Sequence, residues 1–156
     1  MNGTDRIETF LADELATLGL GIQLASGLAP GMLLALRGSL GAGKTTLARG
    51  ILRGLGFEGR VKSPTYSLVE LYELSRLHLY HFDFYRFEDP NELIESGLQD
   101  AFNGTNVCIV EWPEKADRLL PAADIEVTLS MTDSGRTAML TAHSENGKRC
   151  LRQLKI

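Results

Sequence analysis

Cysteine is scarce in this chain, and its scarcity limits the kinds of site that the chain can build. The two cysteines, Cys108 and Cys150, stand far apart in a sequence of 156 residues. A metal centre needs more ligands at closer spacing, and a disulfide scaffold needs more pairs. Cys108 lies within an apolar run, where a thiol packs as a small hydrophobic residue. Two free thiols of this kind are typical of a reducing compartment.

Long hydrophobic runs, a leader sequence and an excess of basic residues are also missing. The apolar stretches reach about six residues, well below the ~20 that a membrane-spanning helix needs. Residues 1–6 lack the basic start and apolar core of a signal peptide. Acidic residues outnumber basic ones by 20 to 16, and no dense stripe of Lys and Arg is present. We therefore expect a cytoplasmic protein with no membrane anchor and no tight grip of its own on nucleic acid.

The sequence has the organisation of one α/β domain. Internal repeats, low-complexity tracts and long linkers are absent, so residues 1–156 are expected to form a single domain. Asp13 can cap a helix over 13–26 whose inner face would carry Leu15, Leu18, Ile22 and Ala25. The apolar run 32–36 shows no alternation, which is typical of a strand buried on both faces.

The rest of the chain continues with helices and further strands. One helix is expected to begin at Lys44 and another to cover 90–99, and the tail from Asp124 reads as a β-meander with turns at 132–135 and 145–147. This mixture predicts an α/β three-layer sandwich with a mixed sheet and a C-terminal antiparallel extension. The expected strands after the second helix are 67–73, 77–83, 107–110, 125–130, 136–142 and 149–154.

Residues 38–45, Gly-Ser-Leu-Gly-Ala-Gly-Lys-Thr, match the phosphate-binding pattern G-x-x-x-x-G-K-[ST]. Glycines let the backbone curl so that successive N–H groups surround a polyphosphate, and the helix that follows adds the positive end of its dipole. Lys44 can reach the phosphate oxygens, and the Thr45 hydroxyl can bind Mg²⁺. The motif, set between a buried strand and a helix, predicts a P-loop NTPase-like fold that binds ATP and Mg²⁺. The expected contacts are Gly38, Gly41, Ala42, Gly43, Lys44, Thr45 and, in support, Thr46.

Two acidic residues follow predicted strands and are candidates to complete the site. Glu111 comes directly after the run 107–110, and Asp83 directly after the run 77–82. Open α/β sheets place their ligand crevice at such strand ends, and Mg²⁺ prefers carboxylate ligands. The pattern does not divide metal binding from water orientation between the two acids. His81 lies on the same face as Asp83, although a single histidine is more often packed or hydrogen-bonded than catalytic.

Two further features leave alternatives open. The loop Ser63-Pro64-Thr65-Tyr66 stands where nucleotide switches place a hydroxyl near the γ-phosphate, but Pro64 also suits a rigid turn. Trp112 can stack on a base, anchor a partner or pack in the core. The residues alone do not decide among these roles.

Four segments in this order resemble the bacterial TsaE (YjeE) family, the ATPase of tRNA threonylcarbamoyladenosine biosynthesis. The resemblance covers nearly the whole chain, and the combination is far more specific than the phosphate-binding loop alone. The segments are Gly38-Ser-Leu-Gly-Ala-Gly-Lys-Thr-Thr46, Val61-Lys-Ser-Pro-Thr-Tyr66, His81-Phe-Asp-Phe-Tyr-Arg86 and Val110-Glu-Trp-Pro113.

The resemblance implies an ATPase that supports a modification at adenosine 37 of tRNA. Its expected partners are a TsaD-like transferase and a TsaB-like companion subunit, with tRNA reached indirectly through their complex. By motif, Lys44 and the loop would hold phosphates, Thr45 and Glu111 would hold Mg²⁺, and Asp83 would serve hydrolysis. The catalytic set would thus be Asp83, Glu111 and Lys44. Further nucleotide or partner contacts implied by the family are Thr65, Trp112, Phe10, Glu14, Gly135 and Arg136.

Two other functions fit the same loop. A small-molecule kinase would need an acceptor pocket and usually an Arg-rich lid, whereas the arginines here, such as Arg76 and Arg86, are scattered. A nucleotide-gated binding module with negligible turnover would share the whole site, because isolated loop NTPases can hydrolyse very slowly. A GTPase is disfavoured, because the guanine-reading Asn-Lys-x-Asp element and the Asp-x-x-Gly element are missing.

Overall fold

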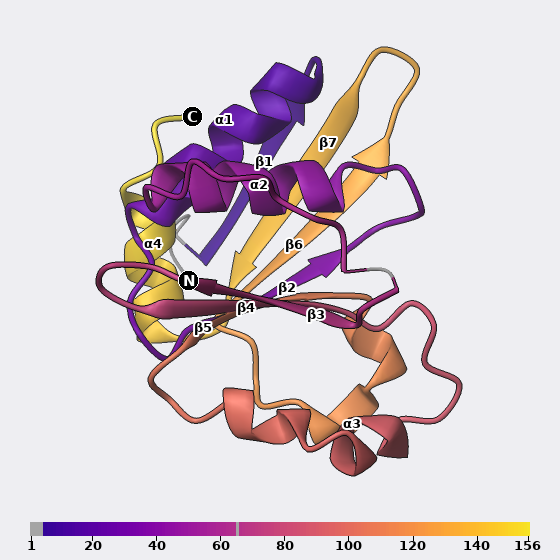
Figure 1. Cartoon of the computed structure of the whole chain (residues 1–156). Helices are drawn as coiled ribbons and strands as arrows, with labels where there is room; N and C mark the ends of the chain where they lie inside the picture. Colours follow the sequence, from indigo (N-terminus) through magenta and orange to yellow (C-terminus); the bar gives the residue numbers. More distant parts are fainter. Residues whose placement is uncertain (1–4, 65) are drawn as a thin grey trace.

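The computed structural model describes residues 5–64 and 66–156, which form a mixed sheet covered by helices (Figure 1). Within these residues the sheet has seven strands in the order β1-β7-β6-β2-β5-β4-β3. The neighbours β6, β2, β5 and β4 are parallel, whereas β1, β7 and β3 pair antiparallel with their neighbours. The predicted fold class, an α/β P-loop NTPase-like sandwich with a mixed sheet, is confirmed. The strands are β1 Arg6–Leu11, β2 Leu33–Arg37, β3 Val69–Glu73, β4 His78–Asp83, β5 Val107–Glu111, β6 Ile125–Met131 and β7 Arg136–Ala142.

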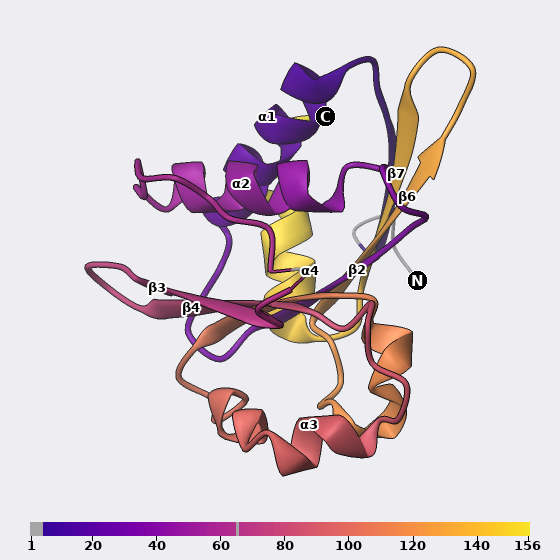
Figure 2. The same ribbon diagram turned by 45° about the vertical axis from the view of Figure 1, so that its right-hand side comes forward.

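Helices lie on both faces of the sheet and create two separate cores (Figures 1 and 2). Helices α1 (Glu14–Ala25) and α2 (Lys44–Gly54) cover one face, and α3 (Asn91–Glu95) with short 3-10 turns covers the other. Strand β2 contributes side chains to both cores: Leu34 and Leu36 belong to the first, and Leu33 and Ala35 belong to the second. A run without alternation is what burial on both faces requires.

The contact between α1 and α2 depends on glycine. A Cβ atom on Gly50 would lie 2.3 Å from the carbonyl oxygen of Leu18, and one on Gly21 would lie 2.5 Å from that of Leu47. Both distances are too short for any side chain, so the two backbones touch directly. This close approach sets α1 firmly against the helix that follows the phosphate-binding loop.

The predicted start of α1 is confirmed, but its predicted inner face is only partly correct. Asp13 caps the helix by accepting a hydrogen bond from the Ala16 N–H at 2.8 Å. Leu15 and Ile22, expected inside, are 75% and 44% exposed. The helix buries Ala25 as expected, together with Thr17, Leu20, Gly21 and Leu24. Glycine adds nothing to a pattern of hydrophobic residues, so the spacing of the large apolar side chains pointed to a different face of the helix from the one that packs on α2.

The C-terminal extension is antiparallel as predicted, but its third strand comes from the N-terminus. Residues 145–152 form α4 (Glu145–Arg152), so the turn at 145–147 and the strand at 149–154 are corrected to a helix. Ser144 caps it by accepting a hydrogen bond from the Gly147 N–H at 3.0 Å. Cys150 and Leu151 are both buried, which a helix allows and an alternating strand facing one core does not. Strand β1, which the sequence analysis did not identify, pairs with β7 instead.

Two smaller points complete the fold. The helix expected at 90–99 is divided into α3 and a 3-10 turn at Leu98–Ala101, because Gly97 between them has a φ of 75°. Across residues 5–64 and 66–156, no helix combines the length and apolar character needed to span a bilayer.

Candidate functional site

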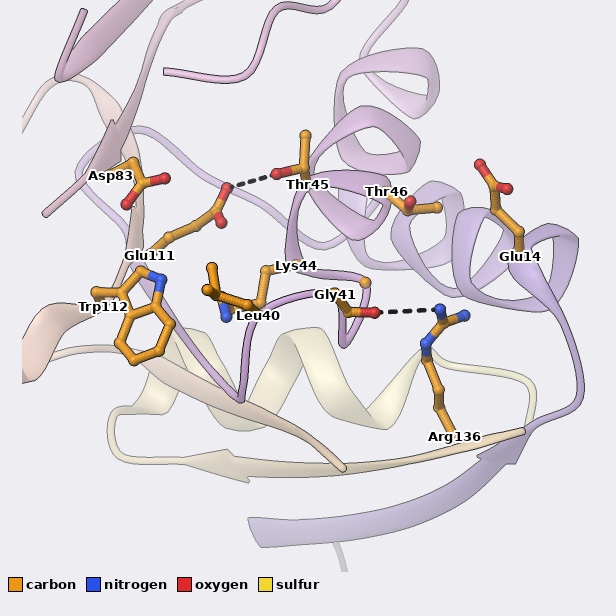
Figure 3. A pocket seen from close by; sticks show the side chains of 11 residues that line it. Glu14, Leu40, Gly41, Lys44, Thr45, Thr46, Asp83, Glu111, Trp112 and Arg136 are labelled. Atoms are coloured by element: carbon orange, nitrogen blue, oxygen red, sulfur yellow. Dashed lines mark hydrogen bonds between the residues drawn. The ribbon is translucent and has the colours of Figure 1, made fainter. Parts of the chain in front are cut away.

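A cleft of about 260 Å³ opens at the carboxyl edge of the parallel strands, directly over the phosphate-binding loop (Figure 3). Strands β4 and β5 deliver one wall, α1 and β7 the opposite wall, and the loop before α2 the floor. Open parallel sheets generally place their ligands at this edge. The lining residues are Glu14, Leu40, Gly41, Gly43, Lys44, Thr45, Thr46, Asp83, Glu111, Trp112 and Arg136.

The loop has the curled backbone that phosphate binding needs. Gly38, Gly41 and Gly43 have φ values of 146°, 78° and 109°, in the region that favours glycine. A Cβ atom on Gly38 would also lie 2.6 Å from the carbonyl oxygen of Leu129, so the loop packs closely on β6. The chain turns into α2 immediately after Gly43, which points the first N–H groups of the helix at the cleft.

Lys44 extends back over this loop and is 4% exposed. Its ammonium donates to the carbonyl oxygens of Gly38 and Ser39, and it lies 4.3 Å from the centroid of the Trp112 ring. Burial lowers the pKa of Lys44, and the carboxylates of Glu111 and Asp83 oppose that shift. The lysine is thus a buried cation held by neutral carbonyls, facing the cleft where an anion would bind.

The two predicted acids lie side by side on the opposite wall. Asp83 ends β4 and Glu111 ends β5, and the register of the parallel pair sets them next to each other. They are 5% and 3% exposed. The Thr45 hydroxyl donates to Glu111 Oε2 at 3.2 Å, and Asp83 Oδ1 accepts the Tyr85 N–H at 2.9 Å. A hydroxyl paired with a carboxylate at this edge provides two oxygen ligands suited to Mg²⁺.

His81 lies behind these acids and is fully buried. Its Nε2 is 2.6 Å from Glu111 Oε2. The expectation that this histidine would be packed and hydrogen-bonded is confirmed. His81 is therefore hydrogen-bonded directly to Glu111, a candidate metal ligand.

The far wall of the cleft carries a second cation. Arg136 begins β7, and its Nη2 donates to the carbonyl oxygen of Gly41 at 3.3 Å. Its Nε is buried and has no hydrogen-bond partner among the described residues. Glu14, at the start of α1, lies nearby in the lining and pairs with Arg49 at 3.3 Å. The cleft therefore has a lysine in its floor and an arginine on one wall, with the acid pair opposite.

The structure brings most of the predicted site residues together, but not all. Ala42 is fully buried beneath the loop, and Gly38 shapes the loop without lining the cleft. Phe10 and Gly135 lie outside the lining and approach each other, since a Cβ atom on Gly135 would be 2.9 Å from Phe10 Cζ. Thr65 lies outside the described residues.

Two residues at the site were missed in the sequence. Leu40 is 63% exposed in the lining, and its place inside the loop motif was the available signal. Tyr85 packs against Trp112 with ring centroids 4.9 Å apart. Trp112 itself has a φ of 57°, a backbone conformation that residues other than glycine rarely adopt. With this turn the indole lies over Lys44 and also packs against the edge of the second core.

Comparison with known proteins gives the family. A sequence model of the family described as "Threonylcarbamoyl adenosine biosynthesis protein TsaE" matches residues 11–138. The chain belongs to the TsaE family. The resemblance inferred from the four motifs is confirmed.

Individual TsaE proteins and one solved structure extend this similarity along the chain. A Haemophilus influenzae protein named tRNA threonylcarbamoyladenosine biosynthesis protein TsaE is 42% identical over 149 residues, covering 92% of this chain and 94% of that protein. A Bacillus subtilis protein of the same name is 40% identical over 114 residues, covering 72% and 71%. The crystal structure of Bacillus subtilis YdiB matches with a TM-score of 0.81 at 28% identity, over 95% of this chain and 93% of that chain.

Proposed function

We propose that this chain binds Mg·ATP in the cleft and hydrolyses it when bound to a partner complex, in support of threonylcarbamoyl modification of adenosine 37 in tRNA. The observation that carries the ATPase proposal is the pair of Thr45 Oγ1 and Glu111 Oε2, 3.2 Å apart beside Lys44. The family membership carries the proposed pathway.

The residues present fit a magnesium nucleotide. The loop N–H groups and Lys44 supply donors for phosphate oxygens, and the Nε of Arg136 is a buried donor with no acceptor among the residues that the structure describes. Thr45 and Glu111 would hold Mg²⁺, which would supply positive charge to offset the charge of the phosphates. The ammonium of Lys44 now rests on neutral carbonyls, and phosphate oxygens make stronger, charge-assisted hydrogen bonds.

The two acids would divide the remaining work. Glu111 already accepts a hydrogen bond from the Thr45 hydroxyl, which supports a role for it on the metal side. Asp83 lies next to it in the register, with Oδ1 fixed by the Tyr85 N–H. We therefore assign Asp83 to orienting the attacking water and accepting its proton. Both carboxylates are nearly excluded from solvent, where electrostatic interactions with a charged ligand are strong.

The partners are a TsaD-like transferase and a TsaB-like companion subunit, and tRNA is reached through their complex. The net charge of −4 suits a subunit that does not hold tRNA itself. Turnover by the isolated chain would be slow. An arginine supplied in trans raises kcat by roughly 10³–10⁵ in other loop NTPases, so activation by a partner is physically reasonable.

Calorimetric titration with Mg·ADP tests the site directly. Lys44→Ala should weaken binding at least ~10-fold, because it removes a buried cation from the phosphate site. Lys155→Ala, an exposed lysine near the C-terminus, is the matched control and should bind like the wild type. Equal affinities for wild type and Lys44→Ala would refute the site.

Product analysis separates this proposal from its two alternatives. Radiolabelled phosphate appearing on a metabolite would establish a kinase. Tight nucleotide binding with no phosphate release, even in the partner complex, would establish a gated binding module.

A further inference from the structure

His81 occupies a position on β4 where an apolar residue would be the ordinary choice. Its neighbour in the register is Ile109 on β5, which is fully buried, and Leu79 two residues earlier is also fully buried. Alternation along the strand puts Leu79, His81 and Asp83 on the face that α2 covers. An imidazole in such surroundings is costly to bury unless it is hydrogen-bonded. Its bonding partner therefore explains why it is there.

That partner is Glu111, and the contact fixes which tautomer the histidine adopts. Nε2 lies 2.6 Å from Glu111 Oε2, whereas Nδ1 has no hydrogen-bond partner among the described residues. If Nε2 lacked its proton, two lone pairs would face each other at this distance. The proton on Nε2 is therefore required, and the neutral ring then leaves only an acceptor, Nδ1, without a partner. Within the described part of the chain, Glu111 makes the one hydrogen bond that orients the ring.

Two donors converge on one oxygen of Glu111. The Thr45 hydroxyl reaches Oε2 from the start of α2 at 3.2 Å, and His81 Nε2 reaches it from β4 at 2.6 Å. A glutamate side chain has three rotatable bonds, and holding one carboxylate oxygen from two sides removes most of that freedom. Water cannot readily replace either hydrogen bond, because Glu111 is 3% exposed and His81 is fully buried.

A competing partner for Glu111 lies in the same cleft. Burial lowers the pKa of Lys44, and Glu111 opposes that shift more than Asp83 or Glu114 does. The carboxylate and the ammonium therefore attract each other. An unrestrained Glu111 would turn toward Lys44, which would remove a ligand from the metal side.

We propose that His81 is a positioning residue that clamps the Glu111 carboxylate beside Thr45 and away from Lys44, so that the Mg²⁺ ligands are formed before nucleotide arrives. The inference rests on the proposed function, since it concerns the same Mg·nucleotide cleft. Outer-shell partners of metal ligands typically change metal affinity by ~10–100-fold when removed. The clamp should therefore affect the magnesium-dependent part of nucleotide affinity and leave the magnesium-free part unchanged.

The test compares two polar variants of similar size. In His81→Gln the side-chain N–H₂ reaches about as far as Nε2, so it can still donate to Glu111; in His81→Asn it is one bond shorter and cannot. ADP affinity is measured by calorimetry in Mg²⁺ and again in EDTA, and the ratio of the two is compared. His81→Leu is added if both polar variants remain folded. His78→Asn, on the exposed part of the same strand, is the control.

The expected result is a Mg²⁺/EDTA affinity ratio that falls ~10-fold in His81→Asn and stays within about threefold of wild type in His81→Gln. The affinity in EDTA should be unchanged in both variants, and thermal unfolding should show that both are folded. A wild-type ratio in His81→Asn would overturn the clamp, as would equal losses with and without Mg²⁺ in both variants. Failure of the wild-type protein to bind ADP at all would instead refute the proposed function.

Discussion

Replacing Gly50 by alanine tests the direct backbone contact between α1 and α2. The new Cβ atom would lie 2.3 Å from the Leu18 carbonyl oxygen, against an ordinary separation of ~3.4 Å or more. The obstacle is backbone, so no side-chain rotation can relieve it, and the helices must separate by about 1 Å. Overpacking of this kind costs ~1–3 kcal/mol. The gain in helix propensity returns up to ~1 kcal/mol, which leaves a net loss of up to about 2 kcal/mol.

Gly19 on α1 provides a matched control, because nothing lies within 4 Å of a Cβ atom placed there. Gly19→Ala should gain ~0.5–1 kcal/mol from helix propensity alone. Thermal unfolding measures both changes. At ~2–4 °C per kcal/mol for a chain of this size, Gly50→Ala should lower Tm by up to about 8 °C and Gly19→Ala should raise it slightly. A Gly50→Ala protein as stable as Gly19→Ala would refute the close helix contact.

Three further predictions concern charge, thiols and an anchoring acid. Burial lowers the pKa of Lys44 below the ordinary lysine value of ~10.4, so the ammonium should lose its proton, and the protein its affinity for Mg·ADP, before the pH reaches that value. Calorimetry that shows no loss of affinity up to pH ~10.4 would contradict this. Burial raises the pKa of Cys108 to about 12 and of Cys150 to about 11, so both thiols should resist DTNB at pH ~8 until urea unfolds the chain, and rapid native labelling would contradict their burial. Asp124 accepts from the Leu33 N–H at 2.8 Å and from the Ser144 hydroxyl at 2.6 Å; Asp124→Ala should cost ~2–3 kcal/mol in urea unfolding, and a loss below ~0.5 kcal/mol would show that this anchor is dispensable.

The central part of the fold was predictable because its signals are local. The unbroken apolar run of β2, the loop glycines and the Asp13 cap each reflect one physical requirement that the sequence states directly. The end of the chain was mispredicted because Asn146-Gly147 resembles a hairpin turn. The Ser144 cap and the basic residues Arg149 and Arg152 in the last turn were helix signals that outweigh it.

The missed strand β1 shows a different limit. Its alternation from Arg6 to Leu11 was present in the sequence, and Ile7, Thr9 and Leu11 are less exposed than Arg6, Glu8 and Phe10. Its partner is β7, more than a hundred residues away, and no local pattern specifies such a pairing. The same distance in sequence explains why the position of Arg136 beside Gly41 could be expected only by family resemblance.

The candidate site was largely accessible from spacing. The predicted acids lie at adjacent strand ends because parallel neighbours finish at one edge, and the register of Asp83 with Glu111 follows from that rule. The bond from His81 to Glu111 was not predictable, because it joins diagonal positions on two strands and depends on side-chain rotamers. Distances of this kind require the three-dimensional structure.

Phosphate release from Mg·ATP, measured with the chain alone and then with the TsaD–TsaB pair, tests the central claim most directly. We expect slow release by the chain alone and strong stimulation by the pair, with Lys44→Ala and Glu111→Gln both unresponsive. Nucleotide that binds tightly yet is released unhydrolysed in the presence of the pair would contradict the proposed ATPase. Stimulation that survives in Lys44→Ala would contradict the assignment of the cleft.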